Sequence, residues 1–388
     1  SKLFFPEGDP SAALLATYGI FAAGFIVRPV GAVLFGWIGD RYGRKAAMVI
    51  AVTMMAIPTG SIGLLPTYES IGILAPVLLT LIRLLQGLSL GGEFSGSITY
   101  IVEHAPANKR GLAGAAPLVS LNMGFLLGLF VTQGFMAALG EADLQAWGWR
   151  VPFILGIAIG LIGFYIRTHC HESPVYEEAR DAGHLSKTPV KDAVKRHPWE
   201  IVQGFAMYMT VTMPFYLIAI YFIGFSQKHL GMAQDDAMWL NIVNITVMMG
   251  MFLFSAWLSD RVGRKPIMIA AALAMFIAAY PLISLLHPDQ AWLTIALAQA
   301  LLAILAGVYI GPVAAVLVEL FPTSVRYTGM AIAYNLSAAL FGGTAPLVCE
   351  WLIRETGSIP SIAYYVMLCN ILSLTALWFY RDRSREAL

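Results

Sequence analysis

The chain has 388 residues, of which 58% are hydrophobic and 12% are charged, and its mean hydropathy is +0.72. In soluble domains about a quarter of the residues are charged, so this composition excludes an ordinary soluble domain and indicates an integral membrane protein. The formal net charge of +1 gives no indication of nucleic acid as a partner.

Apolar runs of spanning length follow one another along the chain. A helix needs roughly 20 mainly apolar residues to cross about 30 Å of hydrocarbon. About eleven such runs occur, near 12–38, 46–65, 72–102, 112–139, 149–167, 200–227, 236–258, 266–286, 291–319, 328–352 and 361–380. Because backbone polar groups in lipid must be satisfied within a helix or a closed barrel, and no strand pattern competes, we expect an all-α integral membrane protein.

Two segments of the first half return in the second half. The turn at 36–45 reappears at 256–265, with Asp-Arg-x-Gly-Arg-Lys in both copies, and 103–111 resembles 319–329. A duplicated unit of membrane spans is typical of a transporter whose two halves rock about a site at their interface.

The duplication also predicts the domain organisation. We expect an N-terminal bundle at 1–167, a hydrophilic linker at 168–198 and a C-terminal bundle at 199–388. Shifted by the repeat, the run at 200–227 has its partner before residue 1. We therefore expect six plus six helices, with helix 1 absent from this chain and the runs above as helices 2 to 12.

Lysine and arginine fall mainly on one side of the expected spans. With the turn at 41–45 placed in the cytoplasm, alternate loops carry Lys109, Arg110, Arg180, Lys187, Lys191, Lys195, Arg196, Arg261, Arg264, Lys265, Arg326, Arg381, Arg383 and Arg385. The opposite side has only Lys2, Arg150, Lys228 and Arg354. The positive-inside rule therefore predicts a cytoplasmic C-terminus.

The sequence resembles the major facilitator superfamily in the repeated turns at 36–45 and 256–265 and in the run that begins at Arg83. Further strings are similar to its metabolite:proton symporters, the carriers of citrate, 2-oxoglutarate, shikimate and proline or betaine. These strings lie at 4–6, 28–31, 91–94, 147–153, 172–174 and 341–346. The resemblance implies two six-helix bundles related by a pseudo-two-fold axis, in a bacterial inner membrane.

Charged residues at the ends of spans form two matching sets. Asp40 can face the positive N-terminus of a helix from the other half, and Arg44 can pair with Glu103. The candidates for a cytoplasmic gate or latch are Asp40, Arg41, Arg44, Glu103, Asp260, Arg261, Arg264, Glu319 and Arg326. The resemblance implies that such contacts hold the cytoplasmic side closed; the alternative is that these loops only fix topology.

Two arginines, Arg28 and Arg83, lie well inside expected spans. An arginine there costs on the order of 3 kcal/mol, so it usually faces a bundle interior or a water-filled cavity. Gln86 and Glu93 follow Arg83 on nearly one helical stripe, which we expect to face a cavity between the halves. Arg83 would then meet an anionic group and Glu93 would carry a proton. The alternative is a fixed internal ion-pair network.

Other polar residues at mid-span depth are Asn122, Tyr216 and Asn335. We include them as candidate substrate contacts, although each is also explained by a hydrogen bond between helices. Neither the histidines nor the cysteines have a metal-binding spacing, and no phosphate loop of the Gly-x-x-x-x-Gly-Lys type occurs, so we predict no enzyme, metal or cofactor. The coupling ion would be a proton.

The sequence thus favours a proton-coupled symporter of a small organic acid such as a di- or tricarboxylate, working by alternating access. The main alternative is a symporter of a zwitterionic osmolyte such as proline or glycine betaine, which also offers a carboxylate to an arginine. A transporter-like nutrient sensor and a passive uniporter remain as other classes. The expected partners are the substrate and the lipid bilayer.

Overall fold

The computed structural model describes residues 3–5 and 10–388. The helices of the first half are α1 (Pro10–Arg41), α2 (Arg44–Leu64), α3 (Tyr68–Ile71), α4 (Leu74–His104), α5 (Arg110–Ala138), α6 (Glu141–Asp143) and α7 (Arg150–His169). Those of the second half are α10 (Pro198–Tyr216), α11 (Phe222–Leu230), α12 (Gln234–Val262), α13 (Arg264–Ser284), α14 (Trp292–Leu320), α15 (Arg326–Ser337), α16 (Ala345–Thr356) and α17 (Ser361–Phe379).

Short turns of other helical types complete these elements. A 3-10 turn, η1 (Ala107–Lys109), precedes α5, and the π-helical turn η2 (Leu144–Gly148) precedes α7. The π-helical turns η3 (Leu217–Tyr221) and η4 (Ala338–Gly342) join α10 to α11 and α15 to α16. Within the described residues, eleven helical stretches are long and apolar enough to cross a membrane, as the sequence predicts, and no strand forms.

The segment expected as a hydrophilic linker folds into two short helices, α8 (Pro174–Asp181) and α9 (Pro189–Arg196). Helix α8 starts where the Ser173 side chain accepts the backbone N–H of Tyr176, with Pro174 in its first turn. Helix α9 packs against α1 of the first half and against α10 and α15 of the second. We call the end of the molecule that carries α8 and α9 the linker end.

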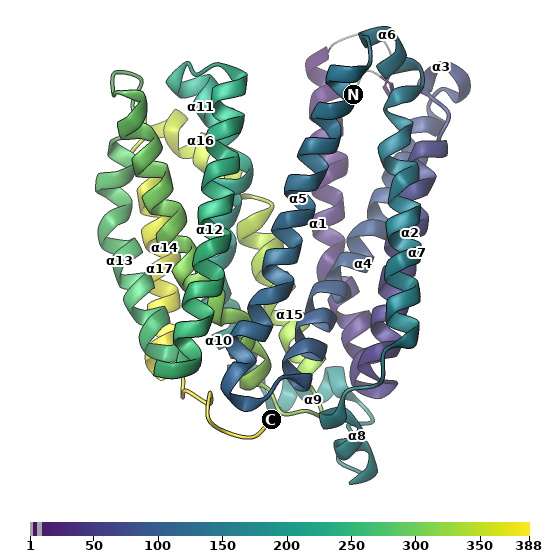
Figure 1. Cartoon of the computed structure of the whole chain (residues 1–388), viewed down its shortest axis with the longest axis vertical. Coiled ribbons are helices and arrows are strands. Elements are labelled where there is room, and N and C mark those ends of the chain that lie inside the picture. The colour runs from purple at the N-terminus through teal and green to yellow at the C-terminus, as the bar shows by residue number, and fades with distance from the viewer. Residues whose placement is uncertain (1–2, 6–9) are drawn as a thin grey trace.

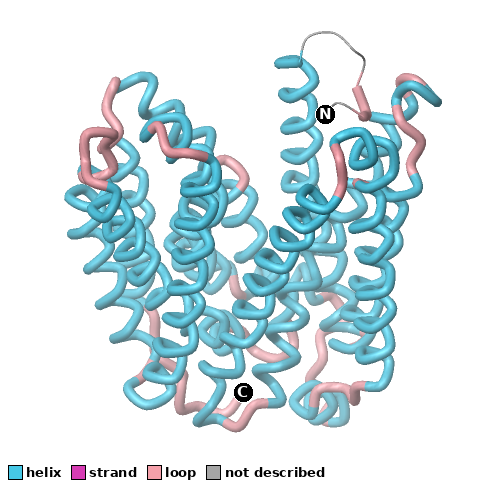
Figure 2. Tube along the Cα trace, turned by 45° about the horizontal axis from the view of Figure 1, so that its top comes forward, coloured by secondary structure: helices cyan, strands magenta, loops and turns pink. Residues whose placement is uncertain are grey.

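Two groups of helices stand side by side, one from each half of the chain (Figure 1). They meet at the linker end, near the C-terminus, and diverge toward the opposite end, as the tilted view in Figure 2 also shows. Away from the linker end, α5 and α12 remain joined by a hydrogen bond of 3.2 Å from Gln133 to the sulfur of Met238.

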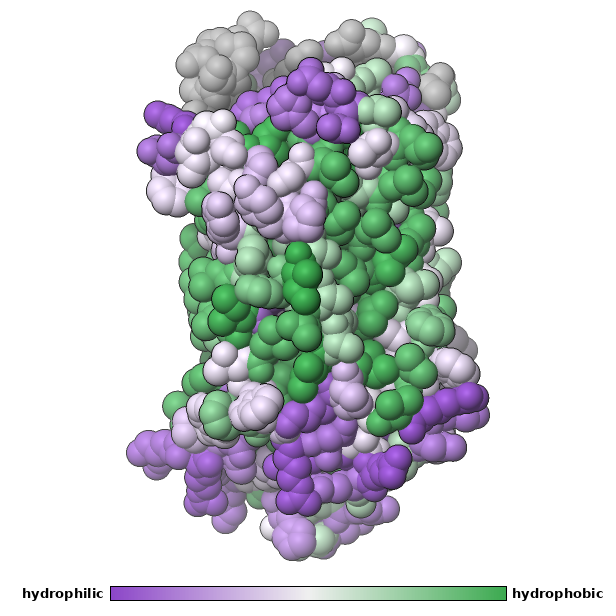
Figure 3. Space-filling view, turned by 90° about the vertical axis from the view of Figure 1, so that its left-hand side faces the viewer, coloured by the Kyte–Doolittle hydropathy of each residue, from purple (hydrophilic) through white to green (hydrophobic). Residues whose placement is uncertain are grey.

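The surface matches a bilayer. On the face shown in Figure 3, apolar side chains form a band across the middle of the molecule, and hydrophilic ones gather at both ends. The described side chains of α7 are all at least partly exposed and include Ile159, Leu161 and Ile162, each more than half exposed. In a membrane this face contacts lipid and not water, so exposing its apolar side chains carries no hydrophobic cost.

Glycines let helices approach closely within each bundle. A Cβ atom at Gly87 or Gly91 of α4 would overlap the backbone of α1, and one at Gly307 or Gly311 of α14 would overlap α12. Small residues at such crossings allow the van der Waals packing that joins helices in lipid. This contact fixes the rotation of α4, and therefore which of its side chains face the space between the bundles.

Candidate functional site: a closed linker end and a central cavity

The turn between α1 and α2 is built around Gly43. Its φ of 113° is a conformation that side chains disfavour, and a Cβ atom there would overlap the Glu172 carboxylate. The space that glycine leaves allows Glu172 to accept the backbone N–H of Arg44 at 3.0 Å. This contact caps the start of α2, and the Arg44 side chain extends into the protein.

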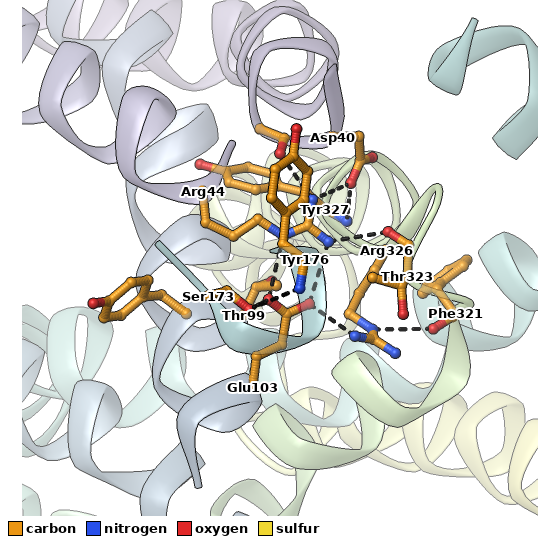
Figure 4. A network of polar contacts seen from close by, with 12 residues as sticks. Asp40, Arg44, Thr99, Glu103, Ser173, Tyr176, Phe321, Thr323, Arg326 and Tyr327 are labelled. Atoms are coloured by element: carbon orange, nitrogen blue, oxygen red, sulfur yellow. Dashed lines mark hydrogen bonds and ion pairs between the residues drawn. The ribbon is translucent and has the colours of Figure 1, made fainter. Parts of the chain in front are cut away.

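Arg44 is fully buried and satisfied on all sides. Its guanidinium pairs with Asp40 at 2.8 Å and with Glu103 at 3.2 Å. It also donates to the carbonyl of Gly39 at 2.8 Å and, across to the other half, to the carbonyl of Thr323 at 3.0 Å (Figure 4). Such a complete set of acceptors is what makes a buried arginine tolerable, because an unpaired one would lose its hydration without return.

The same carboxylates join the two bundles (Figure 4). Asp40 accepts the backbone N–H groups of Tyr327 at 3.1 Å and of Thr328 at 2.8 Å, in the first turn of α15. Glu103 pairs with Arg326 at 2.7 Å. We call Asp40, Arg44, Glu103 and Arg326 the linker-end network, since it ties α1 and α4 to the positive end of α15.

Two further bonds continue this contact toward the middle of the molecule. The Tyr327 hydroxyl donates to the Gly92 carbonyl at 2.6 Å, and the Asn335 amide donates to the Gly91 carbonyl at 2.7 Å. Both carbonyls belong to α4, so α15 is fastened to the first half over more than two turns, from Arg326 to Asn335.

The second half carries a matching set of charges. Arg264 is buried and pairs with Asp260 at 2.6 Å and with Glu319 at 3.3 Å. Asp260 accepts the backbone N–H groups of Gly111 at 2.8 Å and Leu112 at 2.9 Å, at the start of α5. Each half therefore presents one aspartate to a helix N-terminus of the other half.

The two sets are not equal. In the first, Glu103 receives both Arg44 and Arg326, whereas in the second Arg110 donates to the backbone carbonyl of Glu386 at 2.7 Å. Within the described part of the chain, Oε2 of Glu319 is buried and has no hydrogen-bond partner. The firmer closure is thus the one between α1, α4 and α15.

Arg41 and Arg261 lie outside both sets. Arg41 donates to the Lys187 carbonyl in the linker at 2.7 Å, at an exposed position. The Arg261 guanidinium lies 4.0 Å from the centre of the Trp257 ring. Of the residues predicted for a latch, Arg41 therefore contacts the linker and Arg261 contacts its own helix, and these contacts do not join the two bundles.

A cavity with about 540 Å³ of empty space, part of it open to solvent, lies between the bundles. Helices α1, α4 and α5 of the first half and α10, α12, α14 and α15 of the second supply its walls. They contribute Arg28, Phe94, Leu118, Leu121, Asn122, Tyr208, Val211, Thr212, Phe215, Tyr216, Phe252, Ile310, Tyr334 and, from η4, Ala338. Its position between two halves and its mostly apolar walls with few polar groups are typical of a small-molecule site.

Arg28 is the charged residue of this wall and is 7% exposed. Its guanidinium donates to the hydroxyls of Tyr334 at 3.1 Å and Tyr216 at 3.4 Å, and it lies 4.9 Å from the centre of the Phe25 ring. No carboxylate in the described part of the chain pairs with it, and its Nε is buried without a hydrogen-bond partner. Phenols compensate a guanidinium only in part, so the site favours an anionic group from outside the protein.

Aromatic rings surround the remaining space. The Tyr334 ring lies 4.6 Å from Phe94 and 5.0 Å from Tyr208, between ring centres, and Phe215 contacts Tyr216 at 5.5 Å. The faces of such rings carry partial negative charge and attract cations. The cavity thus contains the fixed positive charge of Arg28, which attracts an anionic group, and aromatic rings, which attract a cationic group.

Models of two transporter families match successive parts of the chain: Sugar (and other) transporter over residues 7–192, and Major Facilitator Superfamily over residues 202–388. An inner membrane metabolite transport protein of Escherichia coli, YhjE, is 36% identical over 394 residues, which cover 100% of this chain and 88% of that protein. The chain belongs to the major facilitator superfamily.

Other members of the superfamily resemble it along its whole length. A glycine betaine/proline/ectoine/pipecolic acid transporter of Dickeya dadantii, OusA, is 33% identical over 399 residues, or 100% of this chain and 79% of that protein. The structure of the proton:xylose symporter XylE superposes with a TM-score of 0.82 at 20% identity, covering 97% of this chain and 88% of that one. The chain is therefore a membrane transporter and not an enzyme, and the predicted major facilitator fold is confirmed.

The superfamily's fold places the predicted substrate residues in two groups. Arg28, Asn122 and Tyr216 border the central cavity. Arg83 and Gln86 do not appear in its described wall: Arg83 donates to Gln86 at 3.0 Å, and Gln86 donates to Thr59 of α2. Asn335 donates to the Gly91 carbonyl of α4 and, at 2.9 Å, to the Ala331 carbonyl of its own helix, α15.

Glu93 also lies away from the cavity. Its carboxylate pairs with Arg167 of α7 at 3.0 Å, and both side chains are partly exposed. Of the stripe expected to face a cavity between the halves, Gln86 thus bonds to α2 and Glu93 to α7 within the first bundle, and Arg83 bonds to Gln86 of its own helix. The cause is the rotation of α4: its glycines pack on α1, and Phe94, one residue beyond Glu93, points into the cavity.

Sequence reasoning did not find Tyr208, Tyr334, Phe94 and Arg167. Nothing in the local sequence separates the first three from other apolar-face aromatic residues. Arg167 lies in the last turn of α7 and resembles the basic flank of a span.

Proposed function

We propose that this transporter is a proton-coupled symporter of small zwitterions, molecules in which a carboxylate is joined to a secondary or quaternary ammonium group. The observation that carries the proposal is the central cavity, where the Arg28 guanidinium lacks a carboxylate partner among the described residues and aromatic rings form much of the wall. A carboxylate would bind Arg28, and the attached cation would lie against the rings of Phe94, Tyr208 and Tyr334.

The charge of the cavity favours a zwitterion over a di- or tricarboxylate. The described wall holds one guanidinium, which matches one carboxylate, and no second basic side chain. Further carboxylates would face aromatic rings, whose quadrupoles repel them. The organic-acid hypothesis depended on two arginines in one site, and Arg83 is not in the described wall. The relatives that are named for glycine betaine and proline transport support the same class.

The closed linker end supports alternating access as the transport mechanism. In this structure the linker-end network separates the cavity from the side that carries the basic loops. By the positive-inside rule that side is the cytoplasm, in a bacterial inner membrane. Opening toward the cytoplasm would require Asp40 to separate from the α15 N-terminus and Glu103 to separate from Arg326.

For the coupling proton, we retain Glu93 as the proposed carrier. Its partner Arg167 also donates to the Met48 carbonyl and contacts Ser97, so the guanidinium keeps acceptors when Glu93 is neutral. Protonation of Glu93 would remove the ion pair between α4 and α7 at the depth where α4 meets Tyr327 of α15. This connects a charge change in the first bundle to the contact between the bundles.

Uptake into proteoliposomes tests this proposal. With an acidic exterior, glycine betaine and proline should accumulate, citrate and 2-oxoglutarate should not, and an uncoupler should abolish accumulation. Arg28→Lys should lower uptake by about tenfold or more, because lysine lacks the planar fork that binds a carboxylate at two points. Glu93→Gln should lose accumulation driven by the pH gradient but retain exchange of substrate across the membrane.

Each failure has a distinct meaning. Accumulation of citrate without betaine would restore the organic-acid hypothesis. Uptake that is indifferent to an uncoupler would indicate a uniporter, and binding without any uptake would indicate a sensor.

A further inference from the structure

Two buried polar atoms, in residues that line the central cavity, have no hydrogen-bond partner in the described part of the chain. One is Nε of Arg28, a donor, and the other is Oδ1 of Asn122, an acceptor. Asn122 lies on α5 and is 2% exposed. A buried amide oxygen without a partner costs free energy, which a ligand with a donor group would recover.

The orientation of the Asn122 amide follows from its neighbours. Its Nδ2 donates to the backbone carbonyl of Leu118, one turn earlier in α5, at 2.8 Å. A carbonyl can only accept, so the atom beside it must be the nitrogen of the amide and not the oxygen. The acceptor oxygen of Asn122 is thereby held away from the helix backbone.

An unpartnered asparagine oxygen alone does not identify a site. Asn370 of α17 has the same arrangement: it is buried, its Nδ2 donates to Val366 one turn earlier at 2.8 Å, and its Oδ1 has no partner among the described residues. Asn370 does not belong to the described wall of the cavity. What distinguishes Asn122 is that it shares the cavity with a guanidinium and an aromatic wall.

We propose that Asn122 Oδ1 accepts a hydrogen bond from the ammonium N–H of the substrate, and so determines how the transporter ranks zwitterions by the number of N–H groups on their nitrogen. The inference rests on the proposed function and refines it. Aromatic faces attract any cation, whether or not it carries hydrogen. Of the unpartnered buried atoms in the described wall, the amide oxygen is the acceptor, and such an acceptor separates a secondary ammonium, as in proline, from a fully methylated one, as in glycine betaine.

The two ends of the substrate then have separate determinants. Arg28 binds the carboxylate, which all these zwitterions share. Asn122 binds an N–H group, which only some of them have. A site built to bond an N–H discriminates against an analogue that lacks it, because the amide oxygen is then left buried and unpaired.

The test is a ligand series that changes only the nitrogen: proline, N-methylproline and N,N-dimethylproline, with dissociation constants measured by calorimetry on the full chain in lipid nanodiscs. In the unaltered protein we expect a step in affinity where the last N–H is lost. Asn122→Leu, which keeps the side-chain volume and removes the acceptor, should change the affinity ratio of proline to N,N-dimethylproline by about tenfold. Asn370→Leu is the matched control and should leave this ratio unchanged.

The outcomes separate this inference from the proposed function. If the unaltered protein binds the series and Asn122→Leu weakens all three ligands by the same factor, the role of Asn122 is refuted and the zwitterion function stands. If the unaltered protein binds none of the three, both are refuted. Should Asn122→Leu fail to insert, the series on the unaltered protein still decides, since equal affinity for all three ligands would overturn the inference.

Discussion

Two arginines in α1 and α2 show how the same side chain serves different purposes at different depths. Arg44 is surrounded by two carboxylates and two carbonyls, so its charge is compensated inside the protein. Arg28 has phenol hydroxyls and an aromatic ring, which compensate it only in part. The first arrangement holds helices together, and the second leaves free energy to be gained by binding a carboxylate.

A carboxylate beyond the last span of each half caps the helix that follows the charged turn. Asp382 accepts the backbone N–H of Lys265 in the first turn of α13 at 2.9 Å, as Glu172 does for α2. Burial raises the pKa of Asp382, but the hydrogen bonds from the backbones of Lys265 and Ser384 outweigh it and hold the pKa below its usual value. A depressed carboxyl pKa stabilises the fold above the unfolded-state pKa, and this contribution is lost as pH falls through the folded value.

We therefore predict that Asp382→Ala lowers the stability of the protein at pH 7 by about 1 kcal/mol, as for the loss of a helix cap. The difference from the unaltered protein should shrink as the pH falls below about 4, the ordinary pKa of an aspartate, and should vanish only below the depressed pKa of the folded state, where the carboxyl group is protonated in both folded and unfolded chains. Thermal unfolding in detergent across this pH range measures it. A difference that persists unchanged at the acid end would contradict the capping role.

At the scale of elements, small residues decide how closely helices of the two bundles meet. A Cβ atom at Gly36 of α1 would lie 2.7 Å from Cα of Thr328 in α15, a distance that real side chains do not show. Near the cavity, α10 and α15 both pass into π-helical turns, η3 and η4, so each of the two helices that carry its tyrosines ends in an irregular turn. The bundles are thus tightly packed at one end and more adaptable near the site.

Gly36→Val should act as a wedge between α1 and α15. We predict that it opens the linker end, because overpacking of a tight contact costs about 1–3 kcal/mol and the halves can relieve it by separating. The measurement is the distance between spin labels at Tyr42→Cys and Val262→Cys, both exposed at that end of the two bundles, with native Cys170, Cys349 and Cys369 replaced.

The matched control for the wedge is Gly128→Val in α5, where an added Cβ atom meets nothing within 4 Å. It should leave the label distance unchanged. A Gly36→Val protein with the same distance distribution as the unaltered one would show that this crossing does not limit the conformational change.

At the scale of the molecule, one end of the interface between the bundles holds most of the charge. The ion pair and the carboxylate-to-backbone bonds that cross it lie at the linker end, and the cavity lies beyond them. Each aspartate of the two sets binds a helix N-terminus of the opposite half, so charge and helix dipole act together in the closed state. Rocking of the bundles must exchange these bonds for water.

Asp40→Asn should therefore shift the molecule toward the state that is open at the linker end. The two hydrogen bonds that Asp40 accepts from the start of α15 would lose their negative charge. We expect this loss to raise the ratio of open to closed molecules by roughly tenfold. The same labels at Tyr42→Cys and Val262→Cys report the shift. Asp236→Asn, an exposed aspartate in the first turn of α12, is the control, and equal effects of the two variants would contradict a specific role for Asp40.

The sequence by itself determined the number and type of the spans, because a run of apolar residues in lipid must close its own backbone hydrogen bonds. It also identified the charged turns, since the repeat of Asp-Arg-x-Gly-Arg-Lys places the same chemistry in both halves. The sequence could place Asp40, Arg44 and Glu103 in one cluster, because all three lie at the ends of spans that meet on the same side of the membrane.

Only the tertiary structure decided which polar residues share the cavity. The direction in which a membrane helix faces depends on its packing, and α4 is set by glycine contacts with α1 that turn Glu93 toward α7 and Phe94 toward the site. Periodicity predicts a stripe of polar residues but not the helix that it faces, so the sequence favoured Arg83 over Arg28 as the residue that binds the substrate. The rings of Tyr208 and Tyr334 converge from separate helices, and their meeting depends on how the two halves dock, which no local pattern encodes.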